Sequence, residues 1–328
     1  MKHIVLPDNR PRRLVFYLAM EEYVARCLDE KECFFIWQVT PTVIFGRNQV
    51  LETEVNLPYC RHNNIALYRR KSGGGCVYSD MGNLMISYIK EGDSVGFIFD
   101  TYMRRVALAL QKVGIAAQVS GRNDILVDGR KVSGNAFYQL PGRSIVHGTM
   151  LFNTNFDHLE QAITPSDNKL QSKGVASARQ RVTNLCEYTS MDIAEFRSHL
   201  IATFCDGERM LTEEEIAAIE AIESTYLDEE FIYGRNPRYS YHSGMQRTRA
   251  GEISINADLH HRRISKIELC GDFFVLQDYH ALLNDRLRGV EWSRDAMQEA
   301  LQGISLDRYI QNLTTEELLD IIFTEPIK

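Results

Sequence analysis

The chain has 328 residues, 44% of them hydrophobic, which is enough for one large core and a smaller second one. Its formal net charge of -7 is opposite to that of a general nucleic-acid-binding protein, so we expect no nucleic-acid partner. The apolar run at 14–20 is followed at once by two glutamates, and no apolar run approaches the length of a membrane span. We therefore expect neither a signal peptide nor membrane insertion.

The seven cysteines are scattered and never have Cys-x-x-Cys spacing. This pattern argues against a disulfide framework or a zinc site and is typical of a reducing compartment, so we predict a cytoplasmic protein. Positive charge is distributed unevenly along the chain. Basic residues gather at 61–71, 122–131 and 169–181, which indicates a local anion-binding face on an otherwise acidic chain.

In the first half of the chain, the spacing of apolar residues predicts a helix over 12–28, with Leu14 and Leu18 on its apolar side and Glu21 and Glu22 opposite. A second helix is expected over 97–113, ending at Gly114. Runs of β-prone residues predict strands at 34–39, 42–45, 65–69 and 84–89.

In the second half, Asp128-Gly129 between two β-prone runs predicts a hairpin of 125–127 with 131–133. Further elements are a strand over 144–153, a helix over 193–205, and a helix opened by the capping box of Thr212 and Glu215. The pattern lapses at 234–251, which we interpret as a boundary between a domain of residues 1–243 and a smaller domain of residues 250–328. Strands at 252–256 and 264–269, followed by helices, make the small domain α+β, and the whole chain is of the α/β class.

A glycine-rich loop lies between two of the predicted strands. It reads Arg69-Arg70-Lys71-Ser72-Gly73-Gly74-Gly75-Cys76-Val77-Tyr78. Glycines let a ligand lie against main-chain N–H groups, and the preceding cations favour an anion such as a nucleotide phosphate. The loop has neither the P-loop nor the dinucleotide-binding pattern. Taken alone, it is equally compatible with a flexible hairpin loop beside an exposed basic edge.

Two further clusters follow. The first joins Gly121-Arg122-Asn123-Asp124 to the hairpin and to Lys131-Val132-Ser133-Gly134, and the second is His147-Gly148-Thr149. Each residue has an ordinary structural interpretation by itself, since Lys131 follows a turn and His147 lies in a strand. Their occurrence together, in this order, carries the functional argument.

With these motifs the chain resembles the lipoate–protein ligases of the biotin/lipoate ligase superfamily, over nearly its whole length. The resemblance includes 43–49, 54–56, 69–83, 121–136, His147-Gly148-Thr149, 173–185, 233–237 and Gly271-Asp272-Phe273-Phe274. It implies a mixed-sheet catalytic domain with a small α+β accessory domain at the C-terminal end. It also implies activation of lipoate by ATP and Mg²⁺ to lipoyl-AMP, followed by transfer to a lysine of a carrier protein. The expected carriers are lipoyl domains of 2-oxoacid dehydrogenase complexes and the glycine-cleavage carrier protein, and we expect a monomer.

The resemblance also implies roles for particular residues. Lys131 is the expected catalytic residue, stabilising the acyl-adenylate and the transfer step by its charge, and Asp124 is a candidate metal ligand. An apolar slot for the dithiolane tail is expected around Val77 and Tyr78. The expected lipoate and lipoyl-AMP site comprises Arg70, Ser72, Gly73, Gly74, Gly75, Cys76, Val77, Tyr78, Asn83, Asp124, Lys131, Gly134, His147 and Gly148.

The chain departs from the family pattern at Cys76 and Ser79, where Ala and His are common, and at Tyr17, where Asn is common. Cys76 is interpreted as a packing residue, although a nucleophilic cysteine there would suit an ATP-independent lipoyl or octanoyl transferase. A non-catalytic lipoate-binding protein is a further alternative. A biotin ligase is disfavoured because its Gly-Arg-Gly-Arg loop is absent.

Overall fold

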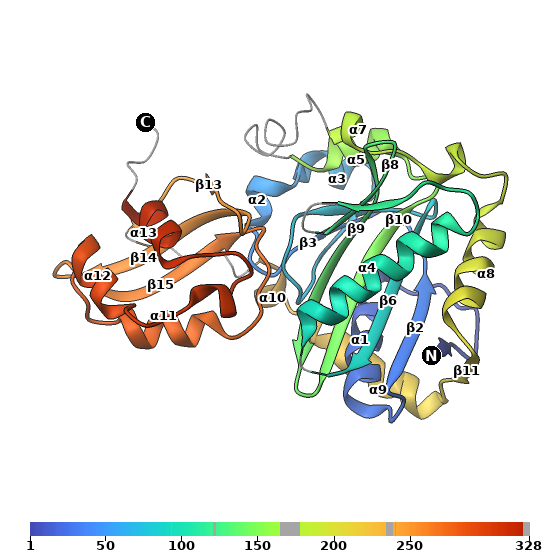
Figure 1. Ribbon diagram of the computed structural model, residues 1–328, viewed down its shortest axis with the longest axis horizontal. Coiled ribbons are helices and arrows are strands. Elements are labelled where there is room, and N and C mark those ends of the chain that lie inside the picture. The colour runs from blue at the N-terminus through green and yellow to red at the C-terminus, as the bar shows by residue number, and fades with distance from the viewer. Residues whose placement is uncertain (93, 121–122, 165–177, 234–238, 240, 324–328) are drawn as a thin grey trace.

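The structure is a computed structural model, and it describes residues 1–92, 94–120, 123–164, 178–233, 239 and 241–323. It has a large lobe, blue to yellow in Figure 1, and a small lobe, orange to red. The predicted residues 121–122 of the second motif and 234–238 of the domain boundary lie outside the described residues.

The strands of the described chain are β1 (Lys2–Val5), β2 (Glu32–Trp37), β3 (Thr42–Phe45), β4 (Ala66–Arg69), β5 (Val77–Ser79), β6 (Asn83–Glu91), β7 (Gln118–Ser120), β8 (Asp124–Val127), β9 (Arg130–Leu140), β10 (Arg143–Leu151), β11 (Gly207–Met210), β12 (Tyr241–His242), β13 (Gln246–Arg247), β14 (Glu252–His260) and β15 (Arg263–Gly271).

The helices are α1 (Leu14–Cys27), α2 (Leu51–Glu54), α3 (Leu57–His62), α4 (Val95–Gln111), α5 (Phe156–Ala162), α7 (Ala178–Arg181), α8 (Ile193–Phe204), α9 (Glu213–Tyr226), α10 (Glu229–Tyr233), α11 (Tyr279–Leu287), α12 (Arg294–Ala300) and α13 (Thr315–Phe323), with short 3-10 helices η1 (Leu185–Glu187) and η2 (Leu306–Arg308).

In the described part of the large lobe the main sheet has eight strands in the order β11-β1-β2-β6-β10-β9-β8-β7. Most neighbours are antiparallel, but β1 runs parallel to both β2 and β11, so the sheet is mixed. A second sheet, β4-β3-β5, carries the glycine loop between its outer strands. The mixed α/β class is thereby confirmed.

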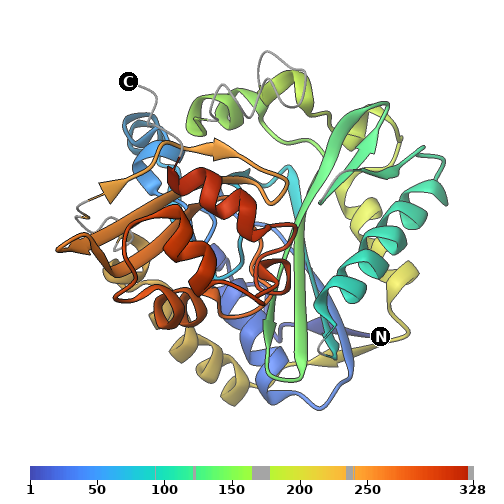
Figure 2. The ribbon, with the colours of Figure 1, turned by 60° about the vertical axis from the view of Figure 1, so that its left-hand side comes forward.

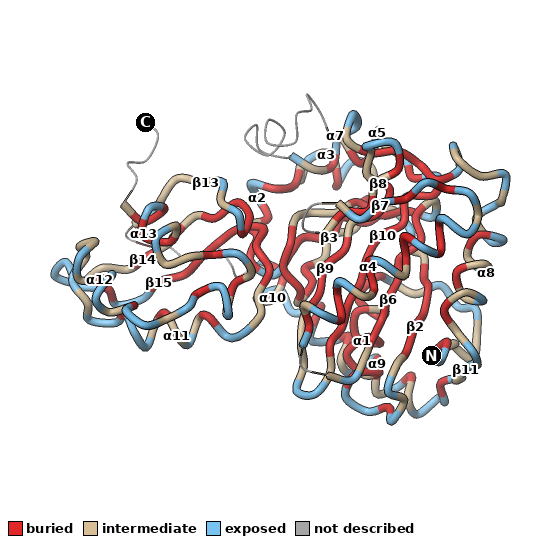
Figure 3. Tube along the Cα trace, viewed as in Figure 1, coloured by how far each residue is buried: buried red, intermediate tan, exposed pale blue. Residues whose placement is uncertain are grey.

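Helices cover both faces of the main sheet, so its central strands β2, β6 and β10 are buried through most of their length, whereas the edge strands β7 and β11 are not (Figure 3). One face packs against α4 and α8 in a core that contains Phe99, Phe137 and Phe196. The other face packs against α1 and α9 in a core that contains Phe16 and Trp37. Hydrophobic side chains on two faces exclude water from the strands between them, and this burial stabilises the lobe.

The hairpin prediction at Asp128-Gly129 is confirmed, because both residues have positive φ, at 48° and 75°, between β8 and β9. This conformation matches a two-residue turn of type I′, for which Asp-Gly is suited. The capping box of Thr212 and Glu215 is also present at the start of α9. The strand after the hairpin is longer than expected, since β9 continues to Leu140.

The prediction that Glu21 and Glu22 lie on an outer face of the first helix is wrong. Both are buried, because α1 is covered on one side by β6 and β10 and on the other by α9. Buried carboxylates require charged or hydrogen-bonding partners, and the structure supplies them for both residues.

The small lobe has its own core, formed by residues between Ala250 and Ile322, with β14 and β15 packed against α11 and α13. This supports the proposed boundary near 243–250. The lobe also enters the large one: the Gly271 N–H donates to the Asn48 carbonyl at 2.8 Å, and Phe274 lies in the large-lobe core beside Phe137. In the turned view of Figure 2 the small lobe stands in front of the large one. Across the described residues, no helix is both long enough and apolar enough to cross a bilayer.

Candidate active site

A cavity is bounded by the glycine loop, the β8–β9 hairpin, β10 and the small lobe. Its wall contains Leu18, Trp37, Ile44, Arg70, Gly74, Gly75, Cys76, Val77, Met85, Asn123, Asp124, Lys131, Gly134, Asn135, Ala136, His147, Gly148, Thr149, Arg181, Arg247, Arg249 and Asp272. Among the described residues, each of the three basic clusters contributes one cation to this cavity, namely Arg70, Lys131 and Arg181, while residues 122 and 169–177 of these clusters lie outside the described chain. The predicted anion-binding face therefore has a definite place in the fold.

Arg70 shapes the glycine loop from inside. Its Nη2 donates to the carbonyls of Gly73 and Gly75 at 2.7 and 2.8 Å, and its Nη1 donates to the Ile44 carbonyl at 3.2 Å. Because these three main-chain carbonyls accept hydrogen bonds from the guanidinium, they are directed at Arg70 and not at a ligand. Burial lowers the pKa of Arg70 to about 10, so the side chain is still a cation at neutral pH.

Two of the loop glycines are required by close packing. Gly74 has φ of 86°, and a Cβ there would meet the Phe274 ring at 3.0 Å. A Cβ on Gly73 would overlap the main-chain carbonyl of Phe273. Any side chain at either position would push the loop and the small lobe apart. Gly73 therefore faces the small lobe rather than the cavity.

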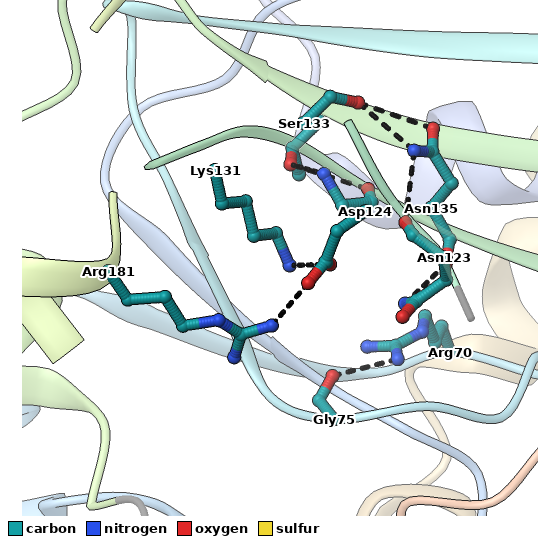
Figure 4. Close-up of polar contacts among 10 residues, drawn as sticks. Arg70, Gly75, Asn123, Asp124, Lys131, Ser133, Asn135 and Arg181 are labelled. Carbon is teal, nitrogen blue, oxygen red and sulfur yellow. Dashed lines mark hydrogen bonds and ion pairs between the residues drawn. The ribbon is translucent and has the colours of Figure 1, made fainter. Parts of the chain in front are cut away.

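Lys131, Asp124 and Arg181 form the cationic wall of the cavity. Figure 4 shows the lysine and the arginine converging on the one carboxylate, with Lys131 Nζ 2.8 Å from Oδ1 and Arg181 Nη2 2.5 Å from Oδ2. Burial raises the pKa of Asp124, but the two cations outweigh burial and hold its pKa well below the usual range. With two cations and one anion, the wall has a net positive charge.

Gly134 leaves the space that the end of the Lys131 side chain occupies. It lies opposite Asp124 in the β8–β9 ladder, and a Cβ at this position would overlap Lys131 Nζ. Any residue with a side chain would displace the ammonium from Asp124. The Lys131 and Gly134 pair predicted from the sequence is therefore one local unit.

The opposite wall is apolar. Leu18, Trp37, Ile44 and Met85 line the cavity and belong to one contiguous core cluster on the α1 face of the sheet. The Trp37 ring stacks on Tyr17 at 4.7 Å between centroids, which fixes its plane. A cavity with one apolar and one cationic wall suits an amphipathic anion.

The structure places most of the predicted site residues on this cavity: Arg70, Gly74, Gly75, Cys76, Val77, Asp124, Lys131, Gly134, His147 and Gly148. It differs from the sequence expectation for four. Tyr78 points into a separate core with Val43 and Phe45, because neighbouring residues of a strand face opposite ways. Asn83 accepts a bond from the Met150 N–H inside the sheet, at 3.0 Å. Ser72 is buried behind the loop against His147, and Gly73 packs on the small lobe.

Several cavity residues were not predicted as site residues. Arg181 lies in the basic cluster 169–181 and Asp272 in the Gly271-Asp272-Phe273-Phe274 motif, but nothing in the sequence places either beside Lys131. Trp37 and Met85 look like ordinary core residues in the sequence. Arg247 and Arg249 come from the small lobe, and only the packing of the two lobes brings them to the cavity.

This fold and this cavity define an enzyme that handles an amphipathic acyl substrate next to a cation-lined, glycine-rich loop. Residues 14–205 match the lipoyl protein ligase A/B catalytic domain, and residues 236–322 match the bacterial lipoate protein ligase C-terminus. The chain therefore belongs to the lipoyl protein ligase A/B family, and it is a lipoate–protein ligase.

Individual relatives agree with this assignment. The chain is 36% identical over 327 residues to lipoate-protein ligase LplJ of Bacillus subtilis, covering 96% of this chain and 97% of the relative. It is similar to a lipoate-protein ligase A solved with ATP, at TM-score 0.63 and 28% identity, over 72% of this chain and all of that one. It is also similar to a bi-partite lipoate protein ligase studied with its E2 lipoyl domain from Thermoplasma acidophilum, at TM-score 0.64 and 29% identity, over 74% of this chain and all of that one.

Proposed function

We propose that the enzyme works in two steps, using ATP to activate lipoate to lipoyl-AMP and then passing the lipoyl group to a lysine of an apo lipoyl domain. The observation that carries this proposal is the meeting of an apolar wall and a cationic wall in one cavity beside a glycine loop. The dithiolane ring and its chain suit the apolar wall, and the carboxylate suits the cations.

In the first step a lipoate carboxylate oxygen attacks the α-phosphorus of ATP, and the bond to pyrophosphate breaks. Two negatively charged groups must approach each other, so the main demand is charge neutralisation. Lys131 and Arg181 meet this demand because both cations line the cavity and pair with the Asp124 carboxylate, for which the anionic substrates can compete. Arg247 of the small lobe adds a further cation to the wall.

In the second step the amine of the carrier lysine attacks the acyl carbon, AMP leaves with the bonding electrons, and the amine loses a proton. Negative charge develops on the acyl oxygen in this step. The Lys131 ammonium lines the cavity, where it can stabilise that charge as it develops. Lys131 is thus proposed as the catalytic residue, acting electrostatically.

Magnesium fits this site only together with the nucleotide. Among the described residues, no group of three or more His, Cys, Asp or Glu side chains is arranged to hold a metal ion. Two carboxylates of the described chain line the cavity: Asp124 is bonded to two cations, and Asp272 accepts from the Glu252 N–H and lies 3.8 Å from Arg247. Mg²⁺ commonly takes one carboxylate together with substrate phosphates, and so we propose Asp124 as its one protein ligand. When bound with ATP, the ion neutralises phosphate charge.

We propose E2 lipoyl domains of 2-oxoacid dehydrogenase complexes as the main carriers and the glycine-cleavage carrier protein as a second. The relative from Thermoplasma acidophilum, studied with its E2 lipoyl domain, supports the first of these. None of the seven cysteines forms a disulfide in the structure, which fits a reducing compartment such as the cytoplasm. We further propose that the enzyme is a monomer.

One observation favours a second candidate, an ATP-independent lipoyl or octanoyl transferase. The Cys76 thiol stands on the cavity wall, where a thioester intermediate would require a nucleophile. Intact-mass measurement of an apo lipoyl domain separates the two functions. A lipoyl mass shift that requires free lipoate, ATP and Mg²⁺ supports the ligase. A shift from a lipoyl or octanoyl carrier donor without ATP, abolished by Cys76→Ala, would replace it with the transferase.

A further inference from the structure

Glu21 is a completely buried carboxylate beneath the cavity. It has 0% exposure, it lies in the middle of α1, and it does not itself line the cavity. Each carboxylate oxygen has its own partner: Ser87 Oγ donates to Oε1 at 2.5 Å, and His147 Nδ1 lies 2.8 Å from Oε2. Burying a carboxylate this deeply costs free energy, and the bonds to both of its oxygens offset that cost.

The first chain of hydrogen bonds leads from Glu21 to the glycine loop. The other ring nitrogen of His147, Nε2, lies 2.7 Å from Ser72 Oγ, and Arg70 Nε donates to the same hydroxyl at 2.9 Å. Arg70 in turn holds the loop carbonyls of Gly73 and Gly75. The loop is therefore connected to Glu21 through three side chains.

The second chain leads to the apolar wall. The indole Nε1 of Trp37 donates to Ser87 Oγ at 2.8 Å, and Ser87 donates onward to Glu21. Trp37 is the aromatic residue of the apolar wall. The carboxylate thus stands between the residue that shapes the loop and the residue that faces the acyl chain.

The chemistry of the partners fixes the direction of both chains. An indole N–H and a guanidinium N–H only donate, and an ionised carboxylate only accepts. For every buried hydroxyl proton to have an acceptor, Ser72 donates to His147 Nε2, and His147 donates through Nδ1–H to Glu21. This arrangement requires a neutral imidazole with its proton on Nδ1.

We propose that Glu21 is a positioning residue that sets the glycine loop through His147, Ser72 and Arg70, and the apolar wall through Ser87 and Trp37. The inference rests on the proposed two-step function, because it assigns the loop to phosphate handling and Trp37 to the lipoyl chain. Glu21 touches neither substrate in this arrangement and acts only through the two chains.

The two chains can be broken separately, and this gives the test. In the full-length enzyme, lipoate-dependent exchange of pyrophosphate with ATP measures the first step. Ser87→Ala removes the link between Glu21 and Trp37 and leaves the His147, Ser72 and Arg70 chain intact, so the KM for lipoate should rise while kcat changes little. Ser72→Ala removes the bonds of this hydroxyl to His147 and to Arg70 and leaves the Ser87 and Trp37 chain intact, so kcat should fall while the KM for lipoate changes little. Glu21→Gln should show both effects, with kcat/KM lower by about 10²-fold.

Glu22 supplies the matched control. It is the next residue of the same helix and is 6% exposed. Its ion pairs are with Arg26 and with Lys71, a loop residue whose ammonium lies over the Tyr226 ring of α9 and does not line the cavity. Glu22→Gln should lower the melting temperature and leave kcat and KM within about twofold of the wild type. Equal kinetic losses in Glu21→Gln and Glu22→Gln, or losses of kcat and KM that do not separate between the two serine variants, would overturn the proposal.

The emission of Trp37 tests the proposal without a measurement of turnover. The chain has two tryptophans, so Trp292→Phe leaves Trp37 as the sole emitter. In that background, without substrates, Glu21→Gln and Ser87→Ala should shift the Trp37 emission, and Glu22→Gln should not. An unchanged emission in Glu21→Gln would refute the link to the apolar wall. A wild-type enzyme without pyrophosphate exchange would instead count against the proposed function, and the emission comparison would still decide the inference.

Discussion

The cavity holds two kinds of cation, and they are held in opposite ways. The Arg70 side chain is buried and donates to main-chain carbonyls and to Ser72, which are parts of the protein that cannot leave. Lys131 and Arg181 have side chains that are 20% and 25% exposed, and both rest on Asp124. Arg70 holds the shape of the site. Lys131 and Arg181 present positive charge, and an anionic substrate can compete with Asp124 for it.

Within this one small region, we therefore expect Arg70 to contribute first to stability, and Lys131 and Arg181 to contribute first to catalysis. Replacing a group that is bonded to the main chain should disturb the fold first and the reaction as a consequence. Replacing a group that is bonded to one exchangeable carboxylate should disturb the reaction first. The following predictions test this separation, from the largest expected effect to the smallest.

Lys131→Ala should reduce lipoyl transfer by about 10²–10³-fold, because it removes a donor aimed at developing negative charge. The unfolding free energy should fall by about 1–3 kcal/mol, since the buried Asp124 keeps Arg181 as a partner. Single-turnover transfer from preformed lipoyl-AMP, with chemical denaturation alongside, measures both. Arg130→Ala is the control: this neighbour donates to Tyr188 on the surface and should retain full activity. Wild-type transfer by Lys131→Ala would remove the lysine from the mechanism.

Arg70→Lys should lower the unfolding free energy by about 3–5 kcal/mol, because an ammonium cannot reproduce the buried fork that holds three carbonyls. Activity should fall about tenfold or more as the glycine loop loosens. Arg69→Lys is a close match for comparison: Arg69 is equally buried and also bonds main-chain carbonyls, but it does not line the cavity. It should destabilise the protein and spare KM. Identical kinetics in the two variants would contradict the shaping role of Arg70.

Asp124→Asn should cost about 1–3 kcal/mol of stability at neutral pH, with a definite dependence on pH. The pKa of Asp124 is lower in the folded protein than in the unfolded chain. Its contribution is therefore fully present above the unfolded value of about 4 and is lost as the pH falls towards the folded value. Denaturation of both proteins from pH 7 to pH 3 should show the stability gap closing at the acidic end. A gap that widens on acidification would refute the ion-pair assignment.

Cys76→Ala should have the smallest effect, with activity within about twofold and a stability loss of about 1 kcal/mol for one truncated side chain. The thiol is here a wall residue rather than a nucleophile. ATP-dependent lipoylation of an apo lipoyl domain, followed by intact mass, is a sufficient measurement. A complete loss of transfer, with unchanged pyrophosphate exchange, would instead support a thioester route.

The parts of the site that are local in sequence were predictable, and those assembled by packing were not. Lys131 and Gly134 follow from the Asp-Gly turn and its ladder, in which neighbours in sequence remain neighbours in space. Glu21 was misassigned to an exposed face, because the spacing within α1 cannot reveal that α9 covers its outer side. Glu22 of α1 and Tyr226 of α9, which bond each other, are 204 residues apart in the chain. Arg247 and Asp272 likewise depend on how the two lobes meet. Tyr78 was misplaced because a strand has two faces and the motif does not indicate which faces the substrate.

The insertion of Phe274 into the large-lobe core has a consequence for synthesis on the ribosome. Chains are made from the N-terminal end, so the large lobe emerges and collapses before its final core residue exists. Until the small lobe is made, a space of one phenylalanine remains open beside Phe137, and gaps of that kind cost about 3–5 kcal/mol. The Phe274 ring also packs against Gly74. The large-lobe core and the glycine loop are therefore completed in the same step, late in the synthesis of the chain.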